Sequence, residues 1–200
     1  ITINDPALYS ESAGIFIQHS TPKEDDKFTV TADMVHYYYY NYSIAADGNL
    51  VAGGCPYRDV DYVADPDSNE GAVVIFKTAD SGATWTQQQE LTDSSITYLG
   101  RNVDLVGDVL VASGDTSLGT GLSKILTWTT ADSGATWTQR STLTTGTIAR
   151  LTKDGSTYRL AVMGGPNDLS FYYSSDGTSW TSDQTITAVS SGIFDVSGDY

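Results

Sequence analysis

Several residue types are scarce in this sequence, and each shortage argues against a class of protein. One cysteine, Cys55, occurs among 200 residues, so an intrachain disulfide is impossible, and the lone side chain is expected to be a small buried apolar one. Lysine and arginine total 10 against 25 aspartates and glutamates, which gives a net charge of −15. Because nucleic-acid binding requires a basic surface, this balance argues against it.

Other absences narrow the class further. No apolar run reaches the roughly 18 residues that a membrane-spanning helix needs. The two histidines, His19 and His36, stand apart and have no neighbouring cysteine, which disfavours a zinc site. The chain begins at Ile1 and shows no signal peptide, as expected of a processed product or an excised segment. No long stretch keeps a helical apolar period, whereas Gly, Ser, Thr, Asp and Tyr are plentiful, so we expect an all-β protein.

One short motif recurs along the chain. Thr-Ala-Asp-Ser-Gly-Ala-Thr-Trp occupies positions 78–85 and returns unchanged at 130–137, and a shortened Ser-Ser-Asp-Gly-Thr-Ser-Trp occupies 174–180. A second landmark shares the repeat, namely an Asp-Gly or Gly-Asp turn followed by an apolar strand that ends in small residues. It occurs at 47–54, 107–114 and 154–165, and a fourth copy begins at 198. Two landmarks with one period of roughly 45–60 residues indicate a repeat architecture.

Each repeat predicts four short strands, which is typical of a propeller blade. We expect these strands at 42–46, 49–54, 72–78 and 84–91, then at 101–106, 109–114, 123–130 and 136–142, then at 147–151, 158–164, 169–174 and 179–185. The fold class predicted is therefore a β-propeller of four-stranded antiparallel blades.

The predicted organisation has three complete blades between two partial ones. The complete blades cover 42–97, 98–146 and 147–187. Residues 1–41 form the end of a worn blade with strands near 15–18 and 28–31, and residues 188–200 begin another. Either the terminal pieces close a four-bladed ring, or the chain is part of a larger propeller of six or seven blades; we expect the second.

The motif residues suit a structural turn. An aspartate can accept hydrogen bonds from backbone N–H groups two or three residues on, glycine adopts positive φ cheaply, and tryptophan can bury a large apolar face as the last strand begins. We therefore assign a structural and non-catalytic role to Asp80, Gly82, Trp85, Asp132, Gly134, Trp137, Asp176, Gly177 and Trp180.

The motif resembles the Asp-box of sialidase-type (BNR) propellers, with two full copies and a third that is one residue short. Trp85-Thr-Gln-Gln88 and the segment 99–114, Leu-Gly-Arg-Asn-Val-Asp-Leu-Val-Gly-Asp-Val-Leu-Val-Ala-Ser-Gly, also resemble FG-GAP repeats, the blades of integrin-α-like propellers. Both resemblances imply the fold and say little of function, because these repeats occur in enzymes, receptors and surface proteins.

The sialidase resemblance implies a site that this chain does not display. That family uses three arginines, a Tyr–Glu pair and an acid/base aspartate. Its Arg-Ile-Pro segment is absent here, and no glutamate stands in a recognisable catalytic setting. Any other glycosidase would need two facing carboxylates, which a sequence cannot reveal. We therefore predict no catalytic residue and keep a sialidase-like glycoside hydrolase as an alternative.

The loop at 55–70 is long and acidic. Asp65, Asp67, Asn69 and Glu70 place oxygen ligands as Ca²⁺ loops do, although the glycine follows at the seventh position and not at the sixth. This loop is therefore either a calcium site or a solvated acidic loop. Propeller topology places it on the face opposite the repeated motifs.

The same face is expected to carry a partner surface. Its candidate residues are Tyr37, Tyr38, Tyr39, Tyr40, Arg58, Asp59 and Asp61. The tyrosines predict either an aromatic platform for a sugar or protein, or a strand packed on both sides. Asn41 begins the one N-glycosylation sequon, which matters only in a secreted eukaryotic or viral protein.

The function we expect is that of a non-catalytic propeller on the outside of a cell, a virion or an appendage. It would act in adhesion, in glycan or protein binding, or in assembly with copies of itself or neighbouring subunits. A purely structural subunit of a virion or surface appendage is the further alternative.

Overall fold

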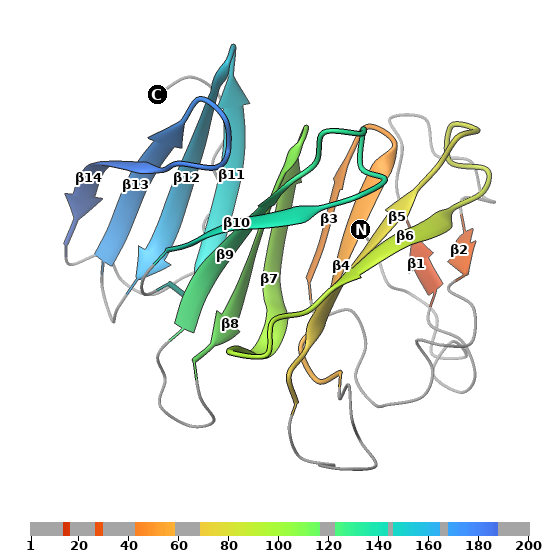
Figure 1. Cartoon of the computed structure of the whole chain (residues 1–200), viewed down its shortest axis with the longest axis horizontal. Helices are drawn as coiled ribbons and strands as arrows, with labels where there is room; N and C mark the ends of the chain where they lie inside the picture. The colour runs from red at the N-terminus through yellow and green to blue at the C-terminus, as the bar shows by residue number, and fades with distance from the viewer. Residues whose placement is uncertain are drawn as a thin grey trace.

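The computed structural model describes residues 14–16, 27–29, 43–58, 69–116, 123–143, 146–164 and 168–187. These residues form strands and turns, arranged as three four-stranded antiparallel sheets and one two-stranded pair (Figure 1). Within them, no helix is long and apolar enough to cross a membrane.

Each four-stranded sheet is one consecutive meander, which we call a blade. Blade I holds β3 (Ser43–Asp47), β4 (Leu50–Cys55), β5 (Ala72–Lys77) and β6 (Thr86–Leu91). Blade II holds β7 (Thr97–Val106), β8 (Val109–Asp115), β9 (Ser123–Thr129) and β10 (Thr138–Leu143). Blade III holds β11 (Ile148–Asp154), β12 (Thr157–Gly164), β13 (Asp168–Ser174) and β14 (Thr181–Ile186). The strands β1 (Gly14–Phe16) and β2 (Lys27–Thr29) pair antiparallel with each other (Figure 1).

The predicted strands are present in the predicted order, and the all-β blade architecture is confirmed. Most boundaries differ by one or two residues, and the last strand of each blade begins just after the motif tryptophan. The larger difference is β7, which begins at Thr97 and not at 101. Its register shifts between Thr97 and Asn102, where Tyr98 and Gly100 have φ of 54° and 97°. The segment boundaries assigned outside the strands stay predictions.

The apolar core lies between neighbouring blades. The β4 and β8 strands are buried along their whole length, whereas β14 is exposed along its whole length. One cluster spans blades I and II, with Leu50, Val73 and Leu110 among its members. A second spans blades II and III and includes Val109 and Leu160. Stacking of the blades therefore removes apolar surface from water and stabilises the fold.

The blades are also joined by polar contacts along their first strands. The Val103 N–H donates to the Ser43 hydroxyl (3.0 Å), and the Ala149 N–H donates to the Asn102 Oδ1 (2.7 Å). The Leu151 N–H donates to an Asp104 carboxylate oxygen at 2.7 Å. Side chains of one blade thus satisfy backbone donors that the next blade leaves unpaired, as buried N–H groups require.

Cys55 ends β4 as a buried thiol outside any disulfide, as the sequence predicted. Burial raises the pKa of this thiol to about 12. It is therefore protonated and unreactive in the folded protein, because the thiolate is the reactive form.

Candidate functional site

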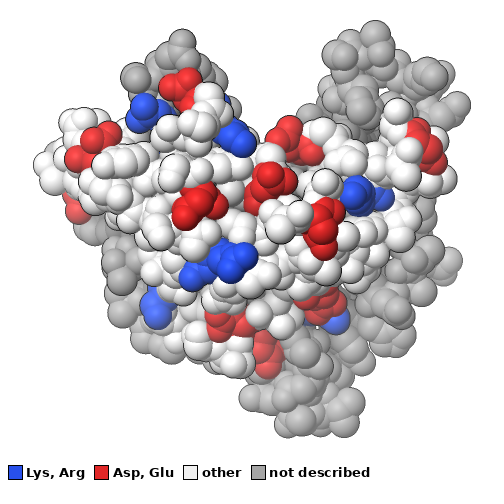
Figure 2. Space-filling view, turned by 45° about the horizontal axis from the view of Figure 1, so that its top comes forward, with Lys and Arg blue, Asp and Glu red and all other residues white. Residues whose placement is uncertain are grey.

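Opposite edges of the blades are built from different connections. The hairpins that join the first strand to the second and the third to the fourth lie at the top of Figure 1, and we call this edge the hairpin face. The end of β4 and the starts of β5 and β7 lie at the lower edge, which we call the connection face. The repeated motifs lie on the hairpin face. On it, acidic and basic side chains are interspersed (Figure 2).

The motif aspartates are held inside their own turns. The Asp80 carboxylate accepts the Thr84 N–H (2.8 Å), the Thr84 hydroxyl (2.6 Å) and the Thr78 hydroxyl (2.7 Å). The second full copy repeats these bonds around Asp132. Hydrogen bonds, chiefly from the threonine hydroxyl four residues on, lower the pKa of both carboxyls to about 2. With its oxygens occupied in this way, neither group is placed as a proton donor at neutral pH.

In the full copies the short backbone hydrogen bond to the aspartate comes from one residue further along than predicted. The N–H that binds Asp80 belongs to the fourth residue on, because Ser81 and Gly82 both adopt positive φ, 59° and 96°, and the chain makes a wider turn. The shortened copy keeps the predicted spacing, since Asp176 accepts from the N–H groups of Thr178 and Ser179.

Threonine and serine hydroxyls at the motif start have a role that sequence reasoning missed. The Thr78 hydroxyl accepts the Gly82 N–H at 2.8 Å, and the Thr130 hydroxyl accepts the Gly134 N–H at 2.9 Å. In the short copy the Ser174 hydroxyl accepts the Gly177 N–H at 2.9 Å. Each hydroxyl thus bonds the glycine N–H of the turn, while the aspartate bonds the residues that follow. A serine or threonine stands two places before the aspartate in all three copies, and this repetition could have predicted the role.

The motif tryptophans are not equally buried. Trp137 is 4% exposed and its indole Nε1 donates to the Gly134 carbonyl at 3.2 Å. Trp85 and Trp180 are only half-buried against the neighbouring apolar clusters. The Trp180 Nε1 is buried without a hydrogen-bond partner among the described residues. Among the described residues, the Trp180 indole thus lacks the turn hydrogen bond that Trp137 makes in a full copy of the motif.

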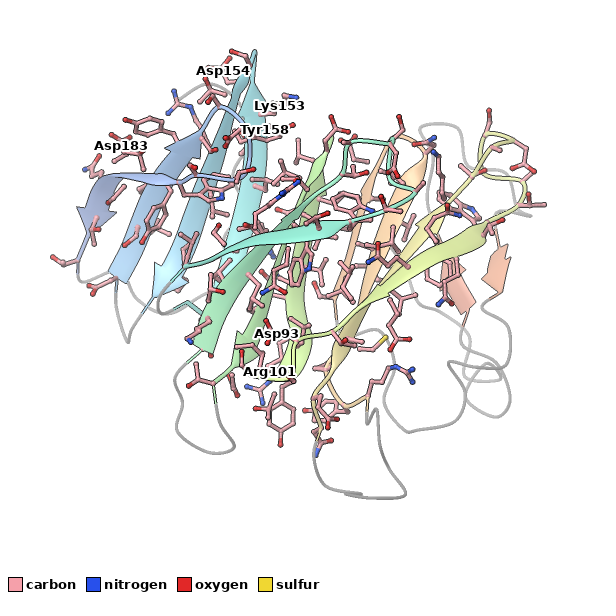
Figure 3. All side chains as sticks on the ribbon, in the orientation of Figure 1. Asp93, Arg101, Lys153, Asp154, Tyr158 and Asp183 are labelled. Carbon is pink, nitrogen blue, oxygen red and sulfur yellow. The ribbon has the colours of Figure 1, made fainter. Side chains whose placement is uncertain are left out.

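The connection face carries a compact polar and aromatic cluster. Asp115, at the end of β8, accepts Arg101 Nη1 through one oxygen and the Ser123 hydroxyl through the other, both at 2.7 Å. Arg101 Cζ lies 4.4 Å from the centroid of the Tyr98 ring, which meets the Tyr57 ring edge-to-face at 5.6 Å. We call these five residues the connection-face cluster. Figure 3 shows Arg101 at the lower edge of the molecule, away from Lys153 and Tyr158.

The cluster is rigid at its base and open at its tip. The Asp115 side chain is 8% exposed, whereas that of Arg101 is 40% exposed. Asp115 is bonded through both oxygens and therefore fixes the guanidinium, and the planar fork keeps further N–H donors at the surface. Tyr98 is held with φ of 54° by a bond from its N–H to the Asn69 carbonyl (2.7 Å). A bulky residue in this region is strained by roughly 1–3 kcal/mol, and such strain collects at functional sites.

Close backbone packing brings the cluster together. A Cβ on Gly100 would lie 2.5 Å from the Ala72 carbonyl oxygen and 2.8 Å from the Gly54 Cα, so blades I and II touch here through glycine. The small residues at the end of the second strand, such as Gly54 in β4, thus allow the next blade to pack closely.

A second ion pair lies on blade I. Arg58, one of the predicted partner-surface residues, contacts Glu90 through Nε and Oε1 at 2.6 Å, with both side chains partly exposed. Sequence reasoning selected Arg58 but missed Glu90, Tyr57, Tyr98, Arg101, Asp115 and Ser123. Several of these residues lie next to loops of the connection face. Their place beside such loops is the feature by which the sequence could have pointed to them.

The remaining predictions fall largely outside the described residues. Those outside are Tyr37, Tyr38, Tyr39, Tyr40, Asn41, Asp59, Asp61, Asp65 and Asp67. Of the predicted Ca²⁺ ligands, Asn69 and Glu70 are described, and their carbonyls accept the N–H groups of Tyr98 and Leu99. In the part of the chain that the structure describes, no three acidic, histidine or cysteine side chains gather as a metal site would need. Calcium binding by the 55–70 loop stays a prediction.

Comparison with known proteins places the fold. An α-L-arabinofuranosidase from Fusarium graminearum, solved with an iminosugar inhibitor, matches with a TM-score of 0.51 and 15% identity over 72% of this chain and 47% of that one. An α-L-arabinanase from Penicillium chrysogenum, solved with arabinobiose, matches with a TM-score of 0.51 and 12% identity over 74% of this chain and 49% of that one. A Trypanosoma rangeli sialidase overlaps too loosely to add to this, with a TM-score of 0.45, 12% identity, and 70% and 27% coverage.

No protein-family model and no curated protein sequence matches the chain. At these identities the structural likeness shows the fold alone, which is a partial β-propeller. The chain spans about half the length of the arabinofuranosidase and the arabinanase.

Proposed function

We propose that this chain is part of a carbohydrate-binding β-propeller and that the connection face holds the glycan. The connection-face cluster carries the proposal, because it joins two aromatic rings to an arginine that is fixed from below by a buried carboxylate. Sugar sites combine aromatic rings with fixed hydrogen-bond donors, and rigid side chains lose little entropy on binding.

Arg101 and Tyr98 are the residues proposed to touch the sugar. Arg101 can donate to vicinal hydroxyls through its fork, and Tyr98 offers ring edge and hydroxyl. Asp115 and Ser123 act through Arg101 and are positioning residues. The Arg58–Glu90 pair on the neighbouring blade would extend this surface.

Architecture supports this class of function. The arabinofuranosidase and the arabinanase act on, or were solved with, sugar compounds, and this chain covers about half of each. We infer that further blades complete a larger propeller, that the motif turns are Asp-boxes of the sialidase type, and that the protein works outside the cell.

Glycoside hydrolysis is the second candidate, and the enzymatic activity of the two structural neighbours favours it. A hydrolase needs two carboxyl groups that flank the glycosidic bond. Asp115 and Glu90 are carboxylates on or beside the cluster, each paired with an arginine. A structural subunit without a ligand is the third reading, and an ordered array with the connection face against a neighbour would favour it.

The test is a titration of the ¹⁵N-labelled chain with arabinobiose, galactobiose, xylobiose and sialyllactose. Binding should move amide signals around Tyr98 and Arg101. Arg101→Gln should weaken that binding about tenfold or more, the scale of a lost charge-assisted hydrogen bond, and Lys77→Gln at the hairpin-face end of β5 should not. The proposal fails if no sugar moves the connection-face signals or if both variants behave alike. Release of reducing ends from the same sugars would favour the hydrolase.

A further inference from the structure

A groove on the hairpin face separates blades II and III. Its volume is about 640 Å³, within the range of about 300–1,000 Å³ that is usual for small-molecule sites. Blade II contributes Asp108, Thr129 and Arg140, and blade III contributes Lys153, Tyr158 and Thr178. The connection-face cluster has no part in it, and Figure 3 shows Lys153 and Tyr158 at the edge opposite Arg101.

Two basic side chains in the groove have neutral partners. Lys153 Nζ donates to the Tyr158 hydroxyl at 3.0 Å and lies 4.5 Å from the centroid of that ring. Arg140 Nε donates to the Thr129 hydroxyl at 2.7 Å. Among the described residues neither forms a salt bridge. In a protein with a net charge of −15, this groove therefore brings two cations together without a carboxylate bonded to either one.

The acidic groups of the groove do not neutralise these cations directly. The Asp176 carboxylate is bonded to the Thr178 and Ser179 N–H groups and to the Ser174 hydroxyl. Asp108 and Asp47 raise the pKa of Lys153 as minor contributors, after the Tyr158 hydrogen bond. Lys153 therefore stays charged throughout the neutral range.

The rest of the lining is hydroxylated. Its serine and threonine residues are Thr129, Thr130, Ser156, Ser175 and Thr178. Hydroxyl groups donate and accept, so they can pair with sugar hydroxyls in either direction. An ammonium and a guanidinium group suit a carboxylate, which arginine can bind through two parallel hydrogen bonds.

We propose that this groove binds a carboxylate-bearing sugar unit, with its carboxylate between Lys153 and Arg140 and its hydroxyls against the serine and threonine side chains. The site is separate from the connection face, so this proposal does not depend on the proposed function.

The experiment titrates the full chain with trigalacturonate and, as the neutral match, with galactotriose. Trigalacturonate should bind and move amide signals around Lys153 and Tyr158, whereas galactotriose should bind at least about tenfold more weakly, as expected for loss of a charge-assisted pair. Lys153→Met and Arg140→Gln should each raise the Kd for trigalacturonate about tenfold.

Two controls make the result specific. Lys77→Met also removes one lysine charge. Lys77 ends β5, next to the motif of blade I and outside the groove, so this change should leave the Kd for trigalacturonate unchanged. Lys124→Met, on β9 and outside the groove, should also leave the Kd unchanged. Equal binding of both sugars, no shift at the groove, or equal weakening by Lys77→Met and Lys153→Met would each overturn the proposal.

Discussion

At the scale of single residues, Gly100 decides how closely two blades approach. It has φ of 97°, and an added Cβ would lie within 2.5 Å of the Ala72 carbonyl oxygen and 2.8 Å of the Cys55 nitrogen. All of these atoms belong to the backbone, so no side chain can rotate away. Gly100→Ala adds a steric clash to the strain of an alanine at positive φ. We expect the clash to lower the free energy of unfolding by about 1–3 kcal/mol beyond that strain, the usual scale of overpacking. Urea unfolding measures this.

Gly48 supplies the matched control. It has φ of 58° and open space around its missing Cβ, so Gly48→Ala carries only the backbone strain of about 1 kcal/mol. If the two variants lose the same stability, the close approach of blades I and II at Gly100 is not a constraint on the fold.

At the scale of the element, the motif turns make the free energy of unfolding depend on pH. The folded state holds the pKa of Asp80 and Asp132 at about 2, below the ordinary value of about 3.9. Groups with a lowered folded pKa contribute stability above their unfolded pKa and lose it as pH falls through the folded one. We therefore expect the contribution of these turns to be complete above pH ~4 and to disappear by pH ~2.

The measurement is the free energy of unfolding against pH for the parent chain and for the Asp80→Asn, Asp132→Asn double variant. The double variant should be less stable at pH 7, and the difference should shrink toward pH ~2. Asp183→Asn, an exposed β14 residue whose carboxylate makes no hydrogen bond to the described residues, should show no such convergence. A constant offset between parent and double variant at every pH would contradict the linkage.

At the scale of the whole molecule, side chains of one blade bond to the backbone of the next. Asn102 is 7% exposed and accepts the buried Ala149 N–H. Asn102→Ala leaves that donor unpaired between blades II and III, and we expect a loss of about 1–3 kcal/mol. At about 2–4 °C per kcal/mol for a domain of this size, calorimetry should show the shift in Tm.

Thr152→Ala is the comparison for this contact. Thr152 lies on the first strand of blade III and makes no side-chain hydrogen bond to the described residues. Its replacement should change Tm by less than about 2 °C, the effect of an ordinary surface substitution. A Tm loss as large as that of Asn102→Ala would show that the effect belongs to the strand and not to the inter-blade bond.

How far the sequence predicts this molecule depends on the range of the interaction. The motif turns are local, because aspartate, hydroxyl and glycine lie within a few residues, so Asp132 and Gly134 stand out in the sequence. The connection-face cluster joins Tyr57 to Tyr98 and Asp115 to Ser123 across loops and blades. No periodicity marks such residues, since they are not shared between repeats.

The sequence by itself determined the blade repeat, the strand order and the side of each blade on which the motif turns lie, because turn chemistry and a β-strand's alternation act over a few residues. The tertiary structure alone decided that Asp115 fixes Arg101, that Tyr98 is held at positive φ, and that Lys153 and Arg140 line one groove. These contacts arise from how closely neighbouring blades stack, and that spacing is set by packing of the whole core.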